Sequence, residues 1–118
     1  MKLIACLSTG KGTWGHVARL VTDGDWEEVF LITNDFGEQN YKNDKKAKMV
    51  LIDHGKGITE MREDIITKLK GPLGSDVEVA VNLVSGDGKL HMALISALLQ
   101  CGVGIKLMAL TKDGINEI

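Results

Sequence analysis

The 118-residue sequence lacks several features that would mark out a class of protein. It has one proline and no tract rich in serine and proline, so long disordered linkers are not expected. Its formal net charge is only −2, which gives no general attraction for nucleic acid or for an anionic membrane. No apolar run reaches the length of a membrane span, and no segment repeats. We therefore expect one globular domain over residues 1–118, with no membrane and no long nucleic acid among its partners.

The sequence is also poor in cysteine and in grouped metal ligands. Its two cysteines, Cys6 and Cys101, stand among apolar residues, which favours buried reduced thiols and a cytoplasmic protein. The apolar run near the N-terminus is too short for a signal peptide. Asp35, Asp53 and His54 have no second spaced pair of ligands, so neither a metal site nor another cofactor is predicted.

Apolar runs alternate along the chain with segments of helical periodicity, which predicts an α/β fold. We expect a Rossmann-like, doubly wound, mainly parallel five-stranded sheet of order 3-2-1-4-5, with helices on both faces. Gly71-Pro72 is expected to end one helix, and the last eight residues to form a short tail. The segment 36–48 has room for at most a short helix. The predicted strands are residues 3–7, 29–32, 49–52, 77–84 and 103–110.

The first strand is followed by a glycine-rich corner. Gly10, Gly12 and Gly15 match the pattern G-x-G-x-x-G, and Asp35 follows at the end of the second strand, where a ribose-binding acid is expected. This spacing is compatible with an NAD-type dinucleotide site, but Lys11 and the bulky Trp14 are unusual in a pyrophosphate turn, and no residues downstream suggest hydride chemistry. A Walker A loop is excluded, because His16 stands where a lysine and a serine or threonine are required.

A second corner joins the fourth strand to an apolar helix over residues 90–101. It reads Ser85-Gly86-Asp87-Gly88-Lys89, and such a turn is typical of anion binding, because backbone N–H groups and the start of a helix attract negative charge. Asp87 fits least with a bound phosphate and is expected to point away and cap the helix. Strands one and four are neighbours in the predicted order, so both corners should lie together at one edge of the sheet.

This second corner resembles the Thr-Gly-Gly-Thr-Lys type corner of CARF domains, the CRISPR-associated Rossmann-fold sensors of cyclic oligoadenylates. The resemblance extends to Lys89-Leu90-His91-Met92, to the helix that closes on Cys101-Gly102, and to Leu7-Ser8-Thr9-Gly10 after the first strand. It implies a nucleotide-binding homodimer in antiviral defence, whose corners after strands one and four line one pocket. Some members of the family also cleave the ring slowly.

The site residues expected from this resemblance lie on both corners. Cyclic oligoadenylates present phosphates and 2′-hydroxyls, which suit backbone N–H groups, lysines and small hydroxyl side chains. If the ring is cleaved, its 2′-hydroxyl is the nucleophile, and Ser8, Lys89 and His91 are the candidate catalytic residues, without a metal. The expected ligand-binding residues are Ser8, Thr9, Gly10, Lys11, Gly12, Asn34, Ser85, Gly86, Gly88 and Lys89.

Two other interpretations stay open at this point. The first is a small dinucleotide-binding protein that uses the Gly10–Gly15 corner and Asp35. The second is an interaction domain without a small ligand, in which the apolar helix and the tryptophans Trp14 and Trp26 contact a partner.

Overall fold

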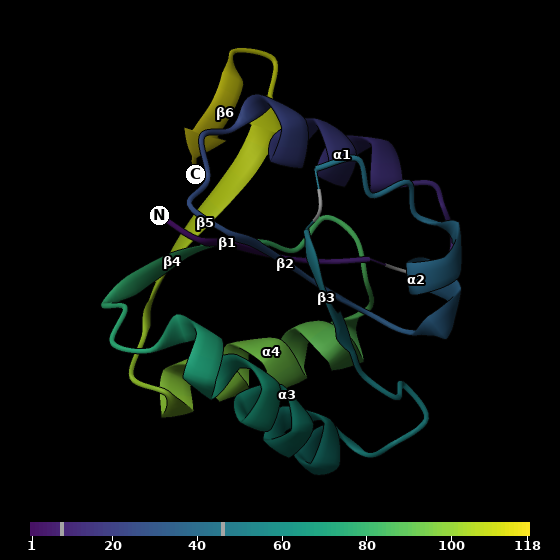
Figure 1. Cartoon of the computed structure of the whole chain (residues 1–118), viewed down its shortest axis with the longest axis vertical. Helices are drawn as coiled ribbons and strands as arrows, with labels where there is room; N and C mark the ends of the chain where they lie inside the picture. Colours follow the sequence, from purple (N-terminus) through teal and green to yellow (C-terminus); the bar gives the residue numbers. More distant parts are fainter. Residues whose placement is uncertain (8, 46) are drawn as a thin grey trace.

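A computed structural model describes residues 1–7, 9–45 and 47–118, in which strands and helices alternate along the chain (Figure 1). Ser8 and Lys46 lie outside the described residues. The elements are β1 (Leu3–Cys6), α1 (Trp14–Asp23), β2 (Val29–Thr33), α2 (Asp35–Asn40), β3 (Lys48–Leu51), α3 (Ile58–Leu73), β4 (Glu78–Asn82), α4 (Gly88–Gln100), β5 (Gly104–Thr111) and β6 (Gly114–Glu117).

The predicted α/β class is confirmed, with one more strand than expected. The sheet has six strands in the order β3-β2-β1-β4-β5-β6. The first five strands of this order pair in parallel, and β6 pairs antiparallel with β5. Because β1 lies between β2 and β4, the connections leave it in opposite directions, and a switch point lies between β1 and β4.

The prediction of a tail after residue 110 was wrong. β5 and β6 form a hairpin in which Thr111 pairs with Gly114, so that two residues make the turn. Gly114 has φ +107°, a value that glycine adopts without strain. The dipeptide Asp113-Gly114 is a hairpin signal that the sequence contained.

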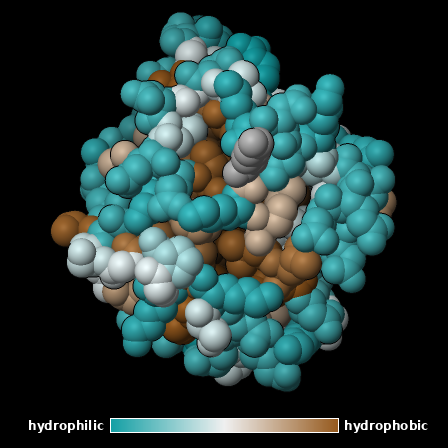
Figure 2. Space-filling model, in the orientation of Figure 1, coloured by the Kyte–Doolittle hydropathy of each residue, from teal (hydrophilic) through white to brown (hydrophobic). Residues whose placement is uncertain are grey.

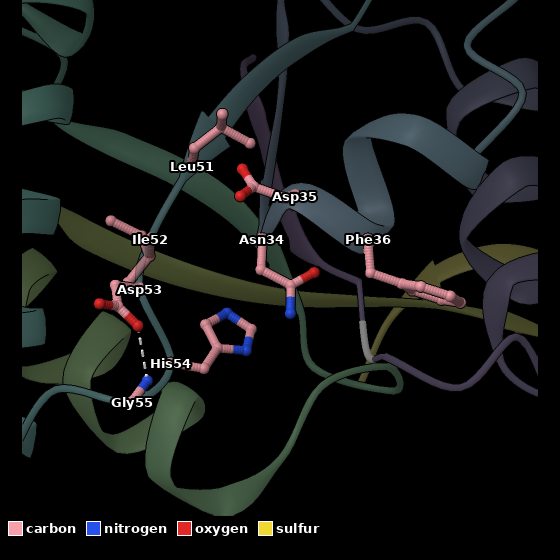
Figure 3. A pocket seen from close by; sticks show the side chains of 8 residues that line it. All are labelled: Asn34, Asp35, Phe36, Leu51, Ile52, Asp53, His54 and Gly55. Carbon is pink, nitrogen blue, oxygen red and sulfur yellow. Dashed lines mark hydrogen bonds between the residues drawn. The ribbon is translucent and has the colours of Figure 1, made fainter.

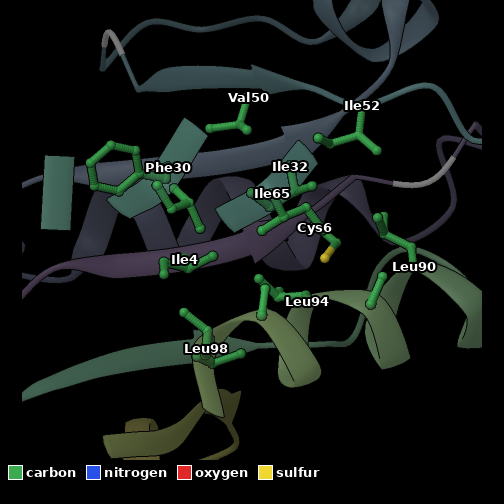
Figure 4. Close-up of a cluster of buried hydrophobic side chains, with 14 of the residues drawn as sticks. Ile4, Cys6, Phe30, Ile32, Val50, Ile52, Ile65, Leu90, Leu94 and Leu98 are labelled. Atoms are coloured by element: carbon green, nitrogen blue, oxygen red, sulfur yellow. The ribbon is translucent and has the colours of Figure 1, made fainter. Parts of the chain in front are cut away.

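Two apolar cores lie on opposite faces of the sheet. In β1, Ile4 and Cys6 face a core formed with α3 and α4, whereas Leu3 and Ala5 face a core formed with α1. This alternation follows from the two-residue period of a strand. Figure 4 shows the larger core, with side chains of α4 beneath those of β1, β2 and β3.

The surface follows from these layers. Figure 1 shows α1 on one side of the sheet and α3 and α4 on the other. On the same face, Figure 2 shows hydrophilic residues over the helices and a band of hydrophobic residues between them, where the sheet lies. None of the helices in the described part of the chain is both long and apolar enough to cross a membrane.

Two predicted boundaries differ from the structure. α3 does not end at Gly71-Pro72 but includes Pro72 in its last turn and ends before Gly74. Two contacts stabilise this extra turn: Leu73 is buried in the larger core, and the Gly74 N–H donates to the carbonyls of Lys70 and Gly71.

The fourth strand is shorter than predicted. The apolar run 77–84 was expected to be a buried strand, but β4 is Glu78–Asn82, and both Val77 and Val84 are exposed. The sequence pattern does not distinguish these flanking valines from Val79 and Val81 inside the strand.

Candidate functional site

The two glycine-rich corners lie at the same edge of the sheet. β1 and β4 are hydrogen-bonded neighbours, with Leu3 opposite Ala80 and Ala5 opposite Asn82. Both strands run in the same direction, so their carboxyl ends, from which the two corners start, are neighbours. The predicted pairing of strands one and four is therefore confirmed.

The corner after β4 is packed tightly around Gly86. This glycine has φ +104°, and a Cβ atom there would lie 2.8 Å from Nε2 of His91 and 3.0 Å from Cβ of Cys6. Nε2 of His91 lies 2.8 Å from the carbonyl oxygen of Ser85, within hydrogen-bonding distance. His91, a candidate catalytic residue, therefore contacts the backbone of this loop through Nε2. The hydroxyl-bearing Ser85 is itself buried.

Asp87 adopts the orientation predicted for it. Its Oδ1 accepts a hydrogen bond of 2.8 Å from the backbone N–H of Leu90, which makes Asp87 the N-cap of α4. Gly88 begins the helix directly after this cap. The carboxylate that fits least with bound phosphate is thus held by the helix.

The side chain of Lys89 extends away from its own corner and contacts the loop after β3. Its Nζ donates a hydrogen bond of 3.1 Å to the backbone carbonyl of His54, in the loop after β3. The β4 corner is thereby tied to the β3 loop. The sequence contains no signal for this contact, because 35 positions separate the two residues.

The corner after β1 is open to solvent. Thr9, Gly10, Lys11 and Gly12 are all exposed, whereas Ser8 lies outside the described residues. The ammonium of Lys11 lies 6.0 Å from the ring centroid of Trp14, and it makes no hydrogen bond or ion pair within the described part of the chain. This lysine is therefore available to an anion approaching the edge of the sheet.

Asn82 and His16 form a partly buried polar contact. Nδ2 of Asn82 donates to the carbonyl of Met108 at 2.8 Å and lies 3.1 Å from Nε2 of His16. The same nitrogen of His16 accepts from the backbone N–H of Leu110 at 3.4 Å. Asn82 is therefore a hydrogen-bonded residue of the interior that joins α1 to β5, and Nε2 of His16 is occupied.

A cavity of about 520 Å³ opens at the carboxyl ends of β2 and β3, which we call the β2–β3 pocket (Figure 3). Asn34 enters it from the end of β2, and its Oδ1 accepts a 3.1 Å hydrogen bond from the Gly37 N–H, so it also caps α2. In Figure 3 the side chain of Asn34 points toward the imidazole of His54. The lining residues are Asn34, Asp35, Phe36, Leu51, Ile52, Asp53, His54 and Gly55.

The structure brings the expected site residues together at one edge but not at one point. The β1 and β4 corners are adjacent, while Asn34 lies on the far side of β1 at the end of β2. The expected ligand-binding residues did not include the loop after β3, which lines the pocket. The polar sequence Asp53-His54-Gly55, directly after an apolar strand, could have indicated this loop.

Neither a reactive thiol nor a metal-binding cluster is found at this edge among the described residues. Burial raises the pKa of the Cys6 thiol to about 12, with a smaller contribution from the negative charge of Asp87, so the thiol stays protonated and unreactive near neutral pH. Among the described residues, no three histidine, cysteine, aspartate or glutamate side chains lie close enough together to hold a metal ion.

Comparison with known proteins gives one partial similarity. No protein-family model matches the chain. The chain is similar to the Holliday junction branch migration complex subunit RuvA of Mycoplasmopsis synoviae (strain 53), with 32% identity over 95 residues. The aligned part covers 67% of this chain and 44% of that protein, so the chain spans less than half the length of this relative.

Proposed function

We propose that the chain is a CARF-like, Rossmann-like nucleotide-sensing domain that binds a cyclic oligoadenylate at the edge formed by the corners after β1 and β4. The observation that carries the proposal is the pairing of β1 with β4, which makes the two glycine-rich corners neighbours. In open parallel sheets, ligands bind outside the carboxyl ends of the strands at such a switch point.

The polar groups at this edge suit a phosphodiester. Lys11 offers an exposed cation, and Thr9 beside it offers an exposed hydroxyl. Gly10 and Gly12 let a ligand come close to the backbone of the same loop. Asp87, the nearest carboxylate of the β4 corner, is engaged by the N–H of Leu90. The repulsion that its charge would exert on a phosphate is reduced by this orientation.

The proposal includes a second copy of the chain, which the family resemblance implies. One face of α4 fills the larger core, and Ile95 packs against that core as well. Met92 and Leu99, seven positions apart on the other side of the helix, are 63% and 66% exposed. We call these two residues the outer face of α4. Large apolar side chains that gather on a surface mark interaction sites, so this face supports a homodimer.

We propose binding rather than cleavage. Near the corners, Nε2 of His91 is within hydrogen-bonding distance of the Ser85 carbonyl, and Nε2 of His16 contacts Asn82. Both histidines thus use this ring nitrogen inside the protein, and Lys89 donates to the carbonyl of His54. None of the three is oriented by these contacts toward the exposed Lys11 loop.

The dinucleotide alternative receives less support. In a dinucleotide fingerprint, the third glycine permits close packing of helix against strand. A Cβ atom added at Gly15 would meet no described atom within 4 Å, and the same holds at Gly10 and Gly12. The described part of the chain therefore gives no packing reason for glycine at these three positions.

Calorimetric titration of the purified protein with cyclic tetra-adenylate and cyclic hexa-adenylate tests the proposed function. We expect one of the rings to bind, and we expect Lys11→Ala to weaken it about tenfold or more, because a charge-assisted contact contributes about 1.5–3 kcal/mol. Lys70→Ala is the matched control, since Lys70 is an exposed lysine in the last turn of α3, and it should change the affinity less than twofold.

The same titration has two outcomes that contradict the proposal. Absence of heat with both rings, at protein well above micromolar concentration, would exclude a cyclic oligoadenylate site. A four-way DNA junction is the third titrant, because the relative is named as a Holliday junction complex subunit. Tight binding of the junction without binding of a ring would replace the proposed ligand, although the net charge of −2 gives no reason to expect it.

A further inference from the structure

The β2–β3 pocket has the size and the edge position of a ligand site. Its volume of about 520 Å³ falls within the usual range for small-molecule pockets, about 300–1,000 Å³. It lies at the carboxyl ends of two parallel strands, where α/β sheets bind ligands. Of the described residues that were expected to bind a ligand, only Asn34 lines it.

The charged groups of the pocket are acceptors of hydrogen bonds. The Asp35 carboxylate makes no hydrogen bond or ion pair with any residue that the structure describes. Oδ1 of Asp53 accepts a 2.8 Å hydrogen bond from the N–H of Gly55, which leaves Oδ2 without a partner among the same residues. Two carboxylates repel a phosphate, so the pocket suits a neutral group that carries N–H and O–H donors.

The polar lining also includes the amide nitrogen of Asn34 and a ring nitrogen of His54. Since Oδ1 of Asn34 is held by Gly37, its Nδ2 is the atom left to donate to a ligand. Nε2 of His54 is buried and has no partner among the described residues. A buried polar atom without a partner is uncommon, and a bound ligand is one way to satisfy it.

An aromatic side chain adds a surface for a planar ring. Phe36 lines the pocket, is 39% exposed and packs against Trp14 with ring centroids 5.9 Å apart. Leu51 and Ile52 supply apolar surface from β3 and the residue after it. The combination of apolar surface, an aromatic ring and convergent polar groups fits a nucleobase with its sugar.

Hydrogen bonds from two helices hold the backbone segment that lines the pocket. Lys68 of α3 donates to the carbonyl of Leu51, and Lys89 of α4 donates to the carbonyl of His54 at 3.1 Å. Both carbonyls belong to the segment that lines the pocket. A wall fixed before the ligand arrives loses less conformational entropy on binding.

We propose that the β2–β3 pocket is an adenosine site, with Asp35 accepting from the ribose 2′-hydroxyl and Oδ2 of Asp53 accepting from the 6-amino group of adenine. Asn34 donates through Nδ2 to a ring nitrogen of the base. The inference deepens the proposed function and rests on it only for the choice of base. Phosphates stay outside, toward Lys11, because Asp35 and Asp53 repel them.

The assignment predicts a specificity between bases. Inosine carries a carbonyl oxygen where adenosine carries the 6-amino group, so its oxygen faces the Asp53 carboxylate and both are acceptors. Asp53→Asn replaces one acceptor with an amide that donates, while its side-chain oxygen can still accept from the Gly55 N–H. The variant should therefore bind adenosine less well and inosine better than the wild type does.

Titration of free nucleosides into the ¹⁵N-labelled chain, followed by amide chemical shifts, tests this site. We expect adenosine to shift the resonances of the pocket residues and to bind at least fivefold more tightly than inosine or 2′-deoxyadenosine. Asp35→Asn should weaken the binding of adenosine about as much as removal of the 2′-hydroxyl does. The affinity of Asp35→Asn for 2′-deoxyadenosine should be only a little lower than the affinity after either change alone. Asp44→Asn, an exposed aspartate outside the pocket, is the matched control.

Three outcomes separate this inference from the proposed function. Ring binding with no adenosine shifts at the pocket overturns the adenosine site and leaves the proposed function standing. Adenosine binding at the pocket without ring binding supports the adenosine site and overturns the proposed function. Binding of spermidine in place of adenosine, abolished by Asp35→Asn, would make the pocket a cation site and also overturn the inference.

Discussion

At the scale of single residues, Gly37 is fixed by a close contact rather than by its backbone angles. A Cβ atom on Gly37 would lie 1.8 Å from Oγ1 and 2.9 Å from Cβ of Thr33, the buried last residue of β2. The N–H of Gly37 also donates to Oδ1 of Asn34, which lines the β2–β3 pocket. α2 can therefore lie this close to the end of β2 only because residue 37 is a glycine and carries no side chain.

Gly37→Ala should lower the free energy of unfolding by about 1–3 kcal/mol, because the added methyl group overpacks the contact with Thr33. Gly15→Ala is the control, since a Cβ there meets no described atom within 4 Å and lies in the first turn of α1. It should be neutral or stabilise the protein by up to about 1 kcal/mol. Denaturation with urea measures both variants, and an equal effect of the two would contradict the close contact.

No local pattern singles out Gly37 among the 14 glycines of the chain. It stands in a polar segment, and its constraint comes from Thr33, which reaches it only once α2 folds back over the strand. The same holds for Lys89, whose partner is a backbone carbonyl in another loop. Contacts of this kind depend on tertiary geometry, and local patterns do not encode them.

At the scale of elements, local chemistry predicted most of the fold. Buried parallel strands are apolar on both faces, so the runs in β1, β2 and β3 were found close to their observed bounds. The N-cap of α4 was also predicted, because Asp87 precedes two residues that begin an apolar helix. The last turn of α3 was missed, since Pro72 normally ends a helix and only tertiary contacts of Leu73 and Gly74 stabilise it.

The cap of α4 can be separated from the charge that Asp87 carries. Asp87→Ala removes the acceptor for the Leu90 N–H and should lower the free energy of unfolding by about 1 kcal/mol. Asp87→Asn keeps a capping side chain of similar quality and removes the negative charge, so its stability should stay within about 0.5 kcal/mol of the wild type. Thermal and urea unfolding measure these differences.

The two variants also differ in what they predict for ligand binding. If phosphates bind beside the β4 corner, Asp87→Asn should bind the cyclic oligoadenylate as tightly as the wild type or more tightly, because a repulsive charge is gone. Weaker binding by a stable Asp87→Asn variant would mean that the carboxylate contacts the ligand directly. That result would contradict the orientation in which Asp87 serves α4 alone.

At the scale of the whole molecule, topology was the most useful prediction for the site. The order of β1 and β4 follows from alternating strands and helices with right-handed connections, and it makes the carboxyl ends of these two strands neighbours. The roles of individual side chains at that edge were harder to predict. His91 was named as a candidate catalytic residue, and its Nε2 lies 2.8 Å from the Ser85 carbonyl, within hydrogen-bonding distance inside the protein.

The outer face of α4 is the feature of the whole molecule that most needs a partner. Met92 and Leu99 are more than 60% exposed, although the opposite face of the same helix already fills the larger core. α4 begins at Gly88, directly after its N-cap Asp87 in the β4 corner. A second copy bound along this helix would therefore lie near the proposed ligand edge, as a shared pocket requires.

Leu99→Lys should convert a dimeric wild type into a monomer. Burying an unpaired ammonium at the interface costs several kcal/mol, and each 1.4 kcal/mol weakens dimerisation about tenfold. Val77→Lys is the matched control, because Val77 is 83% exposed and precedes β4, away from α4 along the chain. Light scattering coupled to size exclusion measures the mass of each variant. A wild type that stays monomeric at high concentration, or a Leu99→Lys variant that stays dimeric, would exclude the outer face of α4 as the interface, and the ligand edge would then have to work within one chain.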